Sequence, residues 1–316
     1  MRKMTGVAVV AIMLLSACSN VSADNKASAE TDQTEKIVET TSFLGGPLYQ
    51  QSIAPERDQR LREQISELKS KVSLSEDEYI SLGGLYASRR QYQAAIGVYS
   101  QGLLKFPNSY KLRRHRGHRY MTVRDLENAI VDFTEALSLI EESEVREYEI
   151  DAKGKPHGTY EHWVWYHIGL YYYLHGDYET AASAFERCLK TGDTNDMLIG
   201  TTDWLYNIYK RSGHDEKARA LVAEISPDIE ADRTYPYFKR VMLYKGVVTP
   251  DEILDPNKPV SEWNGRDMTV AYGIGNWYAY QGETEKANAL HKSVVETPFW
   301  STWAYLAAEK DLSAKQ

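Results

Sequence analysis

The sequence has few cysteines, few phenylalanines and no excess of positive charge. Among its 316 residues only Cys18 and Cys188 carry a thiol, so a small fold held together by several disulfides is excluded. Lys and Arg number 37 against 45 Asp and Glu, and the net charge is −8, which disfavours a nucleic-acid partner. The 6 Phe contrast with 23 Tyr and 7 Trp. Such amphipathic rings are typical of half-buried grooves as well as of cores.

The N-terminal hydrophobic run is short. It follows Arg2 and Lys3, ends at Leu15 and falls below the roughly 20 residues of a spanning helix. Residues 1–17 therefore predict an export signal peptide. Leu15-Ser16-Ala17-Cys18 resembles the lipobox of bacterial lipoproteins, which implies cleavage before Cys18, acylation of its thiol and amine, and a lasting membrane anchor. Through Ser19 the resemblance also implies the outer membrane, facing the periplasm; plain secretion is the alternative.

Two segments precede the main body of the chain. Residues 18–55 are rich in small and polar residues and predict a lipid-anchored flexible tether, because such a composition buries too little apolar surface to offset its ordering entropy. Residues 56–75 predict an N-terminal amphipathic helix, with Leu61, Ile65 and Leu68 on one stripe.

From residue 76 onward the sequence is self-similar. Two copies lie 34 residues apart, and the corresponding positions are Tyr79, Gly83, Tyr86, Ala95 and Tyr99 in one and Arg113, Gly117, Tyr120, Ala129 and Phe133 in the other. Residues 162–188 restore the same frame most clearly, with Trp165, Gly169, Tyr172, Ala181 and Phe185. Small residues at these positions allow two antiparallel helices to approach, and the rings fill the space between successive hairpins.

This pattern resembles the tetratricopeptide repeat. The resemblance implies an all-α solenoid of antiparallel helix hairpins, with a short hairpin or loop insertion and a C-terminal capping helix. The expected boundaries are units 1 and 2 at 76–143, the insertion at 144–161, units 3 and 4 at 162–232, a degenerate unit and loop at 233–267, and the last unit with the capping helix at 268–312.

The resemblance also implies a concave wall lined by the first helix of each unit. The expected ligand-binding residues combine central rings with flanking amides and charges: Arg114, His118, Trp163, Tyr166, Tyr173, Asp203, Asn207, Lys210, Arg211, Tyr272, Asn276 and Tyr280. Arg114, His118 and Asn207 resemble the carboxylate clamp of some relatives, although Asp203 opposes an anion. The alternative is that the cations are solvated and the rings pack between repeats.

The run from Arg113 to Arg119 holds four arginines and two histidines in seven positions. Helical spacing spreads them over more than one face, so one row is expected to meet acidic groups of the chain, with Glu127, Asp132 and Glu135 as candidates. The other row, with Arg114 and His118, is available to an acidic peptide or a phosphate-bearing partner.

Sequence motifs of catalysis are absent. We find no His-Glu-x-x-His, no phosphate-binding Gly-rich loop, no Gly-x-Ser-x-Gly and no paired CxxC, and we expect no cofactor and no metal. Cys188 takes a small buried position of the repeat. The favoured function is a non-catalytic scaffold that binds peptides or partner proteins at the cell envelope. The alternatives are a glycan-binding lipoprotein that uses the groove rings, and a cryptic hydrolase with Glu161 and Asp203 as carboxylates.

Overall fold

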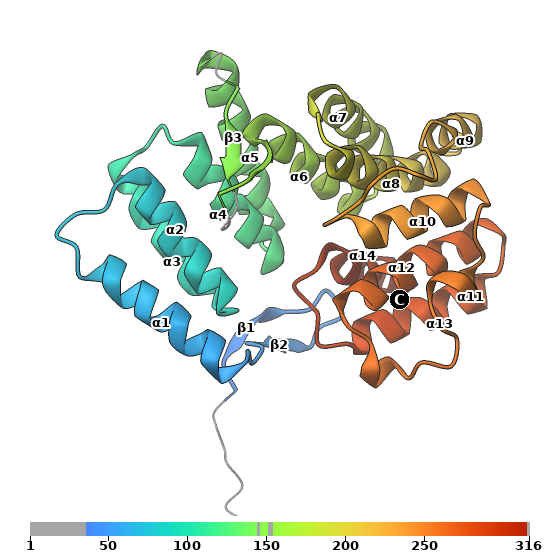
Figure 1. Cartoon of the computed structure of the whole chain (residues 1–316), viewed down its shortest axis with the longest axis horizontal. Helices are drawn as coiled ribbons and strands as arrows, with labels where there is room; N and C mark the ends of the chain where they lie inside the picture. The colour runs from blue at the N-terminus through green and yellow to red at the C-terminus, as the bar shows by residue number, and fades with distance from the viewer. Residues whose placement is uncertain (1–35, 144–145, 151–153, 315–316) are drawn as a thin grey trace, which may run out of the picture. The chain divides into compact units, whose positions relative to one another are not determined.

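The computed structural model describes residues 36–143, 146–150 and 154–314, so the predicted signal peptide and Cys18 lie outside it. The framework is all-α, as predicted, with two small two-stranded sheets (Figure 1). No helix of the described residues combines the length and the apolar character that crossing a bilayer requires.

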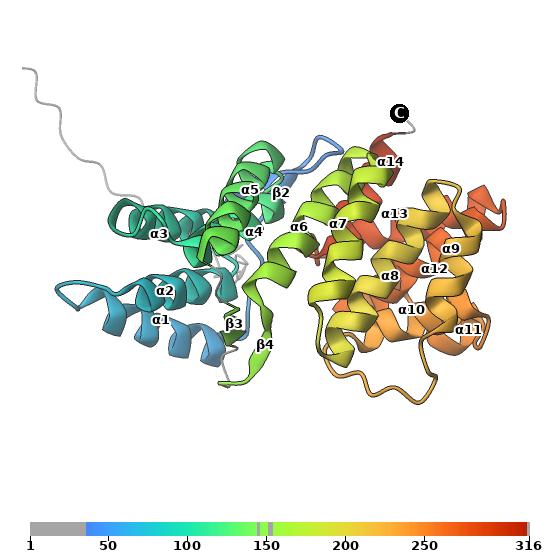
Figure 2. The same ribbon diagram turned by 90° about the horizontal axis from the view of Figure 1, so that it is seen from above.

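Five helix hairpins follow the predicted repeat. They are α2 (Glu76–Ser88) with α3 (Tyr92–Lys105), α4 (Tyr110–Thr122) with α5 (Leu126–Ser143), α6 (Tyr160–His175) with α7 (Tyr178–Thr191), α8 (Asn195–Arg211) with α9 (Asp215–Ala223), and α12 (Gly265–Tyr280) with α13 (Thr284–Glu296). The remaining helices are α1 (Pro55–Lys69), α10 (Tyr235–Lys245), the short α11 (Pro250–Ile253), the 3-10 turn η1 (Val260–Glu262) and α14 (Trp303–Ser313). Neighbouring hairpins pack on one another, which makes the solenoid (Figure 2).

Within a hairpin, the glycine of the first helix lies under a ring of the second. A Cβ on Gly169 would lie 2.5 Å from a ring carbon of Phe185, and one on Gly83 would lie 2.2 Å from Tyr99. Real Cβ atoms do not approach so closely, so these positions accept only glycine without rearrangement. The repeated glycine and aromatic positions of the sequence therefore correspond to a contact between a helix backbone and a ring that recurs along the solenoid.

The turn between the two helices of a unit contains one residue with a positive φ. In the later units it is Gly176, Gly213 or Gly282, with φ of 78° to 82°. In the first two units it is Arg90 or Arg124, with φ of 62° and 65°. This left-handed region costs an L-residue about 1–2 kcal/mol relative to glycine, so the surrounding structure has to offset this cost at the two arginines.

The segment expected to be part of a flexible tether is ordered from residue 36 on. Strand β1 (Val38–Thr41) pairs antiparallel with β2 (Pro47–Tyr49), and the hairpin lies between α1 and the C-terminal helices (Figure 1). The amide of Gln93 donates to Glu39 over 3.0 Å, and Ser42 Oγ donates to Glu309 Oε1 over 2.5 Å. Contacts with distant helices, rather than local apolar patterning, therefore hold this hairpin.

The insertion and the capping helix both form. The described part of the insertion contains β3 (Tyr148–Ile150) paired antiparallel with β4 (Pro156–Thr159). Helix α14 packs on α12 and α13, as a cap should, but it also contacts α6. Its residues 304–309 are all buried, including the polar Glu309, so the helix is covered on more than one side.

Candidate functional site

The predicted wall residues lie on α4, α6, α8 and α12, but most are covered by other parts of the chain. Asp203, Asn207, Tyr272 and Asn276 have no exposed surface, and Arg114, Tyr166 and Tyr173 are almost completely buried. In the described residues the wall is therefore not an open groove along its length. Ligand binding by these residues stays a prediction.

The insertion covers the beginning of the wall on α4. Arg114 Nη2 lies 2.8 Å from Glu149 Oε2, and Lys111 Nζ lies 2.5 Å from Glu147 Oε1. The hydroxyl of Tyr110 donates to the same Glu147 over 2.6 Å. The insertion thus supplies one carboxylate to Lys111 and one to Arg114, which the sequence pattern offers to an external ligand.

Arg113 and Arg116 of the arginine-rich helix pair with two of the three acids that the sequence offers as candidates. Arg116 donates to both oxygens of Asp132, over 2.7 and 2.8 Å, and Arg113 Nη2 lies 2.7 Å from Glu135. Glu127, the third predicted acid, is exposed on α5. The run is therefore largely structural.

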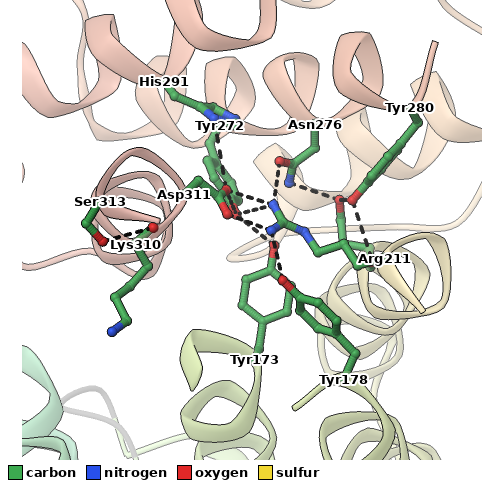
Figure 3. Close-up of polar contacts among 11 residues, drawn as sticks. Tyr173, Tyr178, Arg211, Tyr272, Asn276, Tyr280, His291, Lys310, Asp311 and Ser313 are labelled. Atoms are coloured by element: carbon green, nitrogen blue, oxygen red, sulfur yellow. Dashed lines mark hydrogen bonds and ion pairs between the residues drawn. The ribbon is translucent and has the colours of Figure 1, made fainter. Parts of the chain in front are cut away.

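Helix α14 covers the wall of the later units. Arg211 binds Asp311 through both terminal nitrogens, over 2.6 and 2.7 Å, and the hydroxyl of Tyr272 donates to the same carboxylate over 3.0 Å (Figure 3). Burial alone would raise the pKa of Asp311, but the Arg211 guanidinium and the Tyr272 hydroxyl outweigh it and hold that pKa below its usual range. The Arg211 guanidinium lies 4.9 Å from the centroid of the Tyr173 ring.

The predicted amides meet beside this ion pair. Arg211 Nη2 donates to Asn276 Oδ1 over 3.0 Å, and Asn276 Nδ2 donates to Asn207 Oδ1 over 3.0 Å. The hydroxyl of Tyr280 also donates to Asn207 Oδ1, over 2.9 Å. The structure therefore brings together these predicted residues of α8 and α12, in a network of the chain's own groups.

Sequence reasoning missed Arg240, which is the partner of Asp203. Its Nη2 lies 2.9 Å from Asp203 Oδ2, and both side chains are fully buried. The guanidinium lies 5.2–5.6 Å from the ring centroids of Trp204, Tyr237 and Tyr272. Burial raises the pKa of Asp203 to about 7 even though Arg240 lowers it. Gly273 leaves room for this side chain, because a Cβ there would lie 2.4 Å from Arg240 Nε.

The remaining predicted residues have separate contacts. The ring of His118 packs 4.9 Å from Trp303 of α14, and Tyr166 packs 5.2 Å from Phe185. Trp163 Nε1 donates to the carbonyl of His157 over 2.7 Å. Lys210 pairs with Asp215. These contacts favour packing roles, which is the alternative that the sequence left open.

One part of the wall stays open to solvent. Between α6, α7 and α14 lies a pocket of about 300 Å³, lined in part by Tyr173, Tyr178, Lys310 and Asp311. Figure 3 shows Tyr178 and Tyr173 on one side and Lys310 and Asp311 on the other. The pocket, which we call the α14 pocket, offers ring surface, a cation and a carboxylate that Arg211 holds in place.

Reactive groups are not gathered in the described residues. No cluster of three or more His, Cys, Asp or Glu side chains among them is arranged to hold a metal ion. Cys188 is completely buried, and burial raises the pKa of its thiol far above the ordinary value. Its position in α7 is the small buried position that the repeat requires.

The hairpin α6–α7 is similar to a known repeat family. A family model for the tetratricopeptide repeat matches residues 163–191, which span most of α6 and all of α7. Residues 163–191 therefore match a tetratricopeptide repeat, and they form the helix hairpin α6–α7. A comparison of this repeat protein with curated sequences yields no match.

Several solved structures are similar to this chain. A tetratricopeptide repeat protein from Parabacteroides merdae has 14% identity and a TM-score of 0.48, with 80% of this chain and 99% of that chain covered. YrrB, described as a protein of this type with an unusual peptide-binding site, has 16% identity and a TM-score of 0.40, with 82% and 98% covered. BtubC from P. vanneervenii has 19% identity and a TM-score of 0.42, with 66% and 78% covered. Likenesses at this identity concern the fold alone.

Proposed function

We propose that this protein is a non-catalytic scaffold that binds a peptide segment of a partner protein in the α14 pocket. The observation that carries the proposal is the composition of that pocket. Tyr178, which is partly exposed, offers ring surface, Lys310 offers an ammonium, and Asp311 offers a carboxylate on an adjacent residue, whereas Tyr173 is 3% exposed and adds little surface. Rings that are already fixed lose little entropy on binding, and paired charges of both signs suit the polar groups of a peptide.

The pocket is preorganised by the network behind it. Tyr173 and Tyr272 share a hydrogen bond of 2.8 Å, and Arg211 Nη1 donates to the hydroxyl of Tyr178 over 3.3 Å. These contacts fix the two rings and the carboxylate before a ligand arrives. Binding then costs mainly the ordering of the peptide and the exchange of the contact between the Lys310 ammonium and the Phe43 ring, which is 4.6 Å to the centroid.

Glycan capture is less well supported. Stacking on a sugar needs an exposed ring face, whereas Tyr272 has no exposed surface and Tyr166 is almost fully buried. The indole nitrogen of Trp163 is already bound to a carbonyl of the chain. A hydrolase is disfavoured for a similar reason, because Asp203 is inaccessible and paired with Arg240.

We also propose that the scaffold is held at the cell envelope by lipid on Cys18, on the outer membrane facing the periplasm. The support is the signal peptide and lipobox pattern, which lies outside the described residues. Expression with an alkyne analogue of palmitate should label the wild-type chain and leave Cys18→Ala unlabelled. Labelling of both, or of neither, would refute the anchor and leave the binding proposal intact.

The binding proposal is tested with the full-length chain carrying Cys18→Ser and purified without lipid. Peptides selected from a library by this chain should bind, in fluorescence anisotropy, with an affinity that Tyr178→Ala weakens by about tenfold or more. The matched control is Tyr235→Ala, which removes an exposed tyrosine of α10. Equal affinities in both variants, or capture of oligosaccharides but no peptide, would contradict the proposal.

A further inference from the structure

A second, larger pocket lies outside the concave wall. Its volume is about 610 Å³, and it is lined mainly by β2, the segment that follows β2 and the loop between α13 and α14. It shares no lining residue with the α14 pocket. The rings of Tyr49, Phe299 and Trp300 line it together with Lys36 and Arg90, and no carboxylate does.

The absence of a carboxylate from the lining distinguishes this pocket from its surroundings. The chain has a net charge of −8, and Arg114, Arg211 and Arg240 are each paired with an acid of the chain. Arg90, by contrast, makes no ion pair within the described residues, and its Nη1 donates only to the hydroxyl of Tyr92, over 3.2 Å. Two cations and several rings without an acid favour an anionic, partly apolar ligand.

Arg90 has no acidic partner in the described residues, whereas the arginine at the same position of the next unit has one. Arg90 and Arg124 occupy the same turn position of units 1 and 2, where the later units have glycine, and both have a positive φ. The side chain of Arg124 compensates by binding the carboxylate of Glu309 over 2.9 Å. Arg90 has the same backbone cost and no such acid. A carboxylate from another molecule would complete the equivalent contact.

The floor of the pocket is rigid. Trp300 Nε1 donates to the carbonyl of Tyr49 over 2.9 Å, and its ring packs 5.3 Å from Tyr92. The hydroxyl of Tyr305 donates to the carbonyl of Val295 over 3.0 Å. The walls are accessible, because Tyr49 is 39% exposed and Lys36 is exposed. A fixed floor with accessible rings lowers the entropic cost of capture.

The pocket around Arg90 continues into another pocket along the chain. A neighbouring pocket of about 320 Å³ shares Gln50, Gln51 and Ser52 with the first one. Within the described residues, the backbone N–H groups of Gln51, Ser52 and Ile53 donate to no backbone acceptor. Free amides beside two connected pockets suit a ligand in extended conformation, because its main chain can pair with them.

From these observations we infer that the pocket around Arg90 binds an extended acidic peptide segment of a partner, with a carboxylate on Arg90 and Lys36 and an adjacent apolar side chain on Tyr49 and Phe299. This site is separate from the proposed function at the α14 pocket. Either can fail without the other.

The test uses the full-length Cys18→Ser chain and fluorescein-labelled octapeptides with one position fixed as Asp, Glu, Lys or Phe. We expect selection of Asp or Glu next to an aromatic residue, and an affinity that falls as NaCl is raised, since the contact is between charges. Arg90→Gly should weaken binding of the selected peptide by about tenfold or more. Its melting temperature should not fall, because glycine relaxes the positive φ.

Controls separate this site from general charge effects and from the α14 pocket. Lys217→Ala removes one exposed positive charge on α9 and should leave the affinity unchanged, as should Tyr178→Ala. Tyr49→Ser should weaken binding while it keeps the main-chain bond to Trp300. Selection of basic or uncharged peptides, or an unchanged affinity in both Arg90→Gly and Tyr49→Ser, would overturn the inference.

Discussion

The guanidinium of Arg124 and the carboxylate of Glu309 meet in the interior although 185 residues separate them in sequence. Their side chains are 4% and 0% exposed. Arg124 also donates to the carbonyl of Trp300 over 2.7 Å, and Glu309 accepts from Ser42. The pair therefore joins the turn after α4, the loop before α14 and the N-terminal hairpin.

Removing one member of this pair should be costly. Glu309→Gln leaves the Arg124 charge buried without a counter-charge, and we expect the free energy of unfolding to fall by about 3–5 kcal/mol. Denaturation in urea measures it. Glu127→Gln, at an exposed position of α5, should change it by less than about 0.5 kcal/mol. The double variant Arg124→Met, Glu309→Leu should recover much of the loss. Equal losses of unfolding free energy in Glu309→Gln and Glu127→Gln would contradict this role.

Two adjacent glycines of α2 should respond in opposite ways to alanine. A Cβ on Gly83 collides with the Tyr99 ring, whereas a Cβ on Gly84 meets nothing within 4 Å. We expect Gly83→Ala to destabilise by about 1–3 kcal/mol through overpacking. Gly84→Ala should stabilise by up to about 1 kcal/mol through helix propensity. Thermal unfolding of both variants compares them directly, and shifts of the same sign would be inconsistent with the contact.

Stability should depend on pH through His162. Burial lowers its pKa from 6.5 to about 4, although the Cys188 carbonyl opposes this shift. A lowered pKa in the folded state means that the contribution is complete above pH 6.5 and is lost as the pH falls toward 4. The difference corresponds to about 3 kcal/mol. The stability gap between wild type and His162→Gln should therefore shrink by that amount from pH 7 to pH 4, measured by chemical denaturation. A constant gap would argue against it.

The thiol of Cys188 should be inert in the folded chain. It has no exposed surface, and burial raises its pKa, so little thiolate is available. In the Cys18→Ser chain, Ellman's reagent should find no reactive thiol in buffer and one in denaturant. Ser183→Cys, at an exposed position of the same helix, should react about a thousandfold faster than Cys188 or more. Comparable rates would refute the burial.

The repeat could be predicted because several units use the same local contact between a glycine and a ring. Gly169 and Phe185 lie 16 residues apart, as Gly83 and Tyr99 do, and the pattern needs no knowledge of other units. The same frame placed Arg211, Asn207 and Asn276 on facing helices, where they do meet.

The coverage of the wall could not be predicted, because its partners are distant in sequence. Helix α14 has the pattern of a one-sided cap, and nothing near Asp311 indicates that it meets Arg211, 100 residues away. The strands β1 and β2 have four and three residues, too few for a periodic signal. Arg240 belongs to the degenerate unit, where the repeat gives no register for its side chain.

The bonds of the β1–β2 hairpin decide where a mechanical load enters the molecule. A pull on residue 36 reaches Tyr49 and Ser42 before it reaches α1, and these two residues are tied to Trp300 and Glu309. The β1–β2 hairpin and the C-terminal segment around α14 then carry the applied force together. The chain should resist peeling from its N-terminal end, unit after unit, and should rupture instead at the junction with α14.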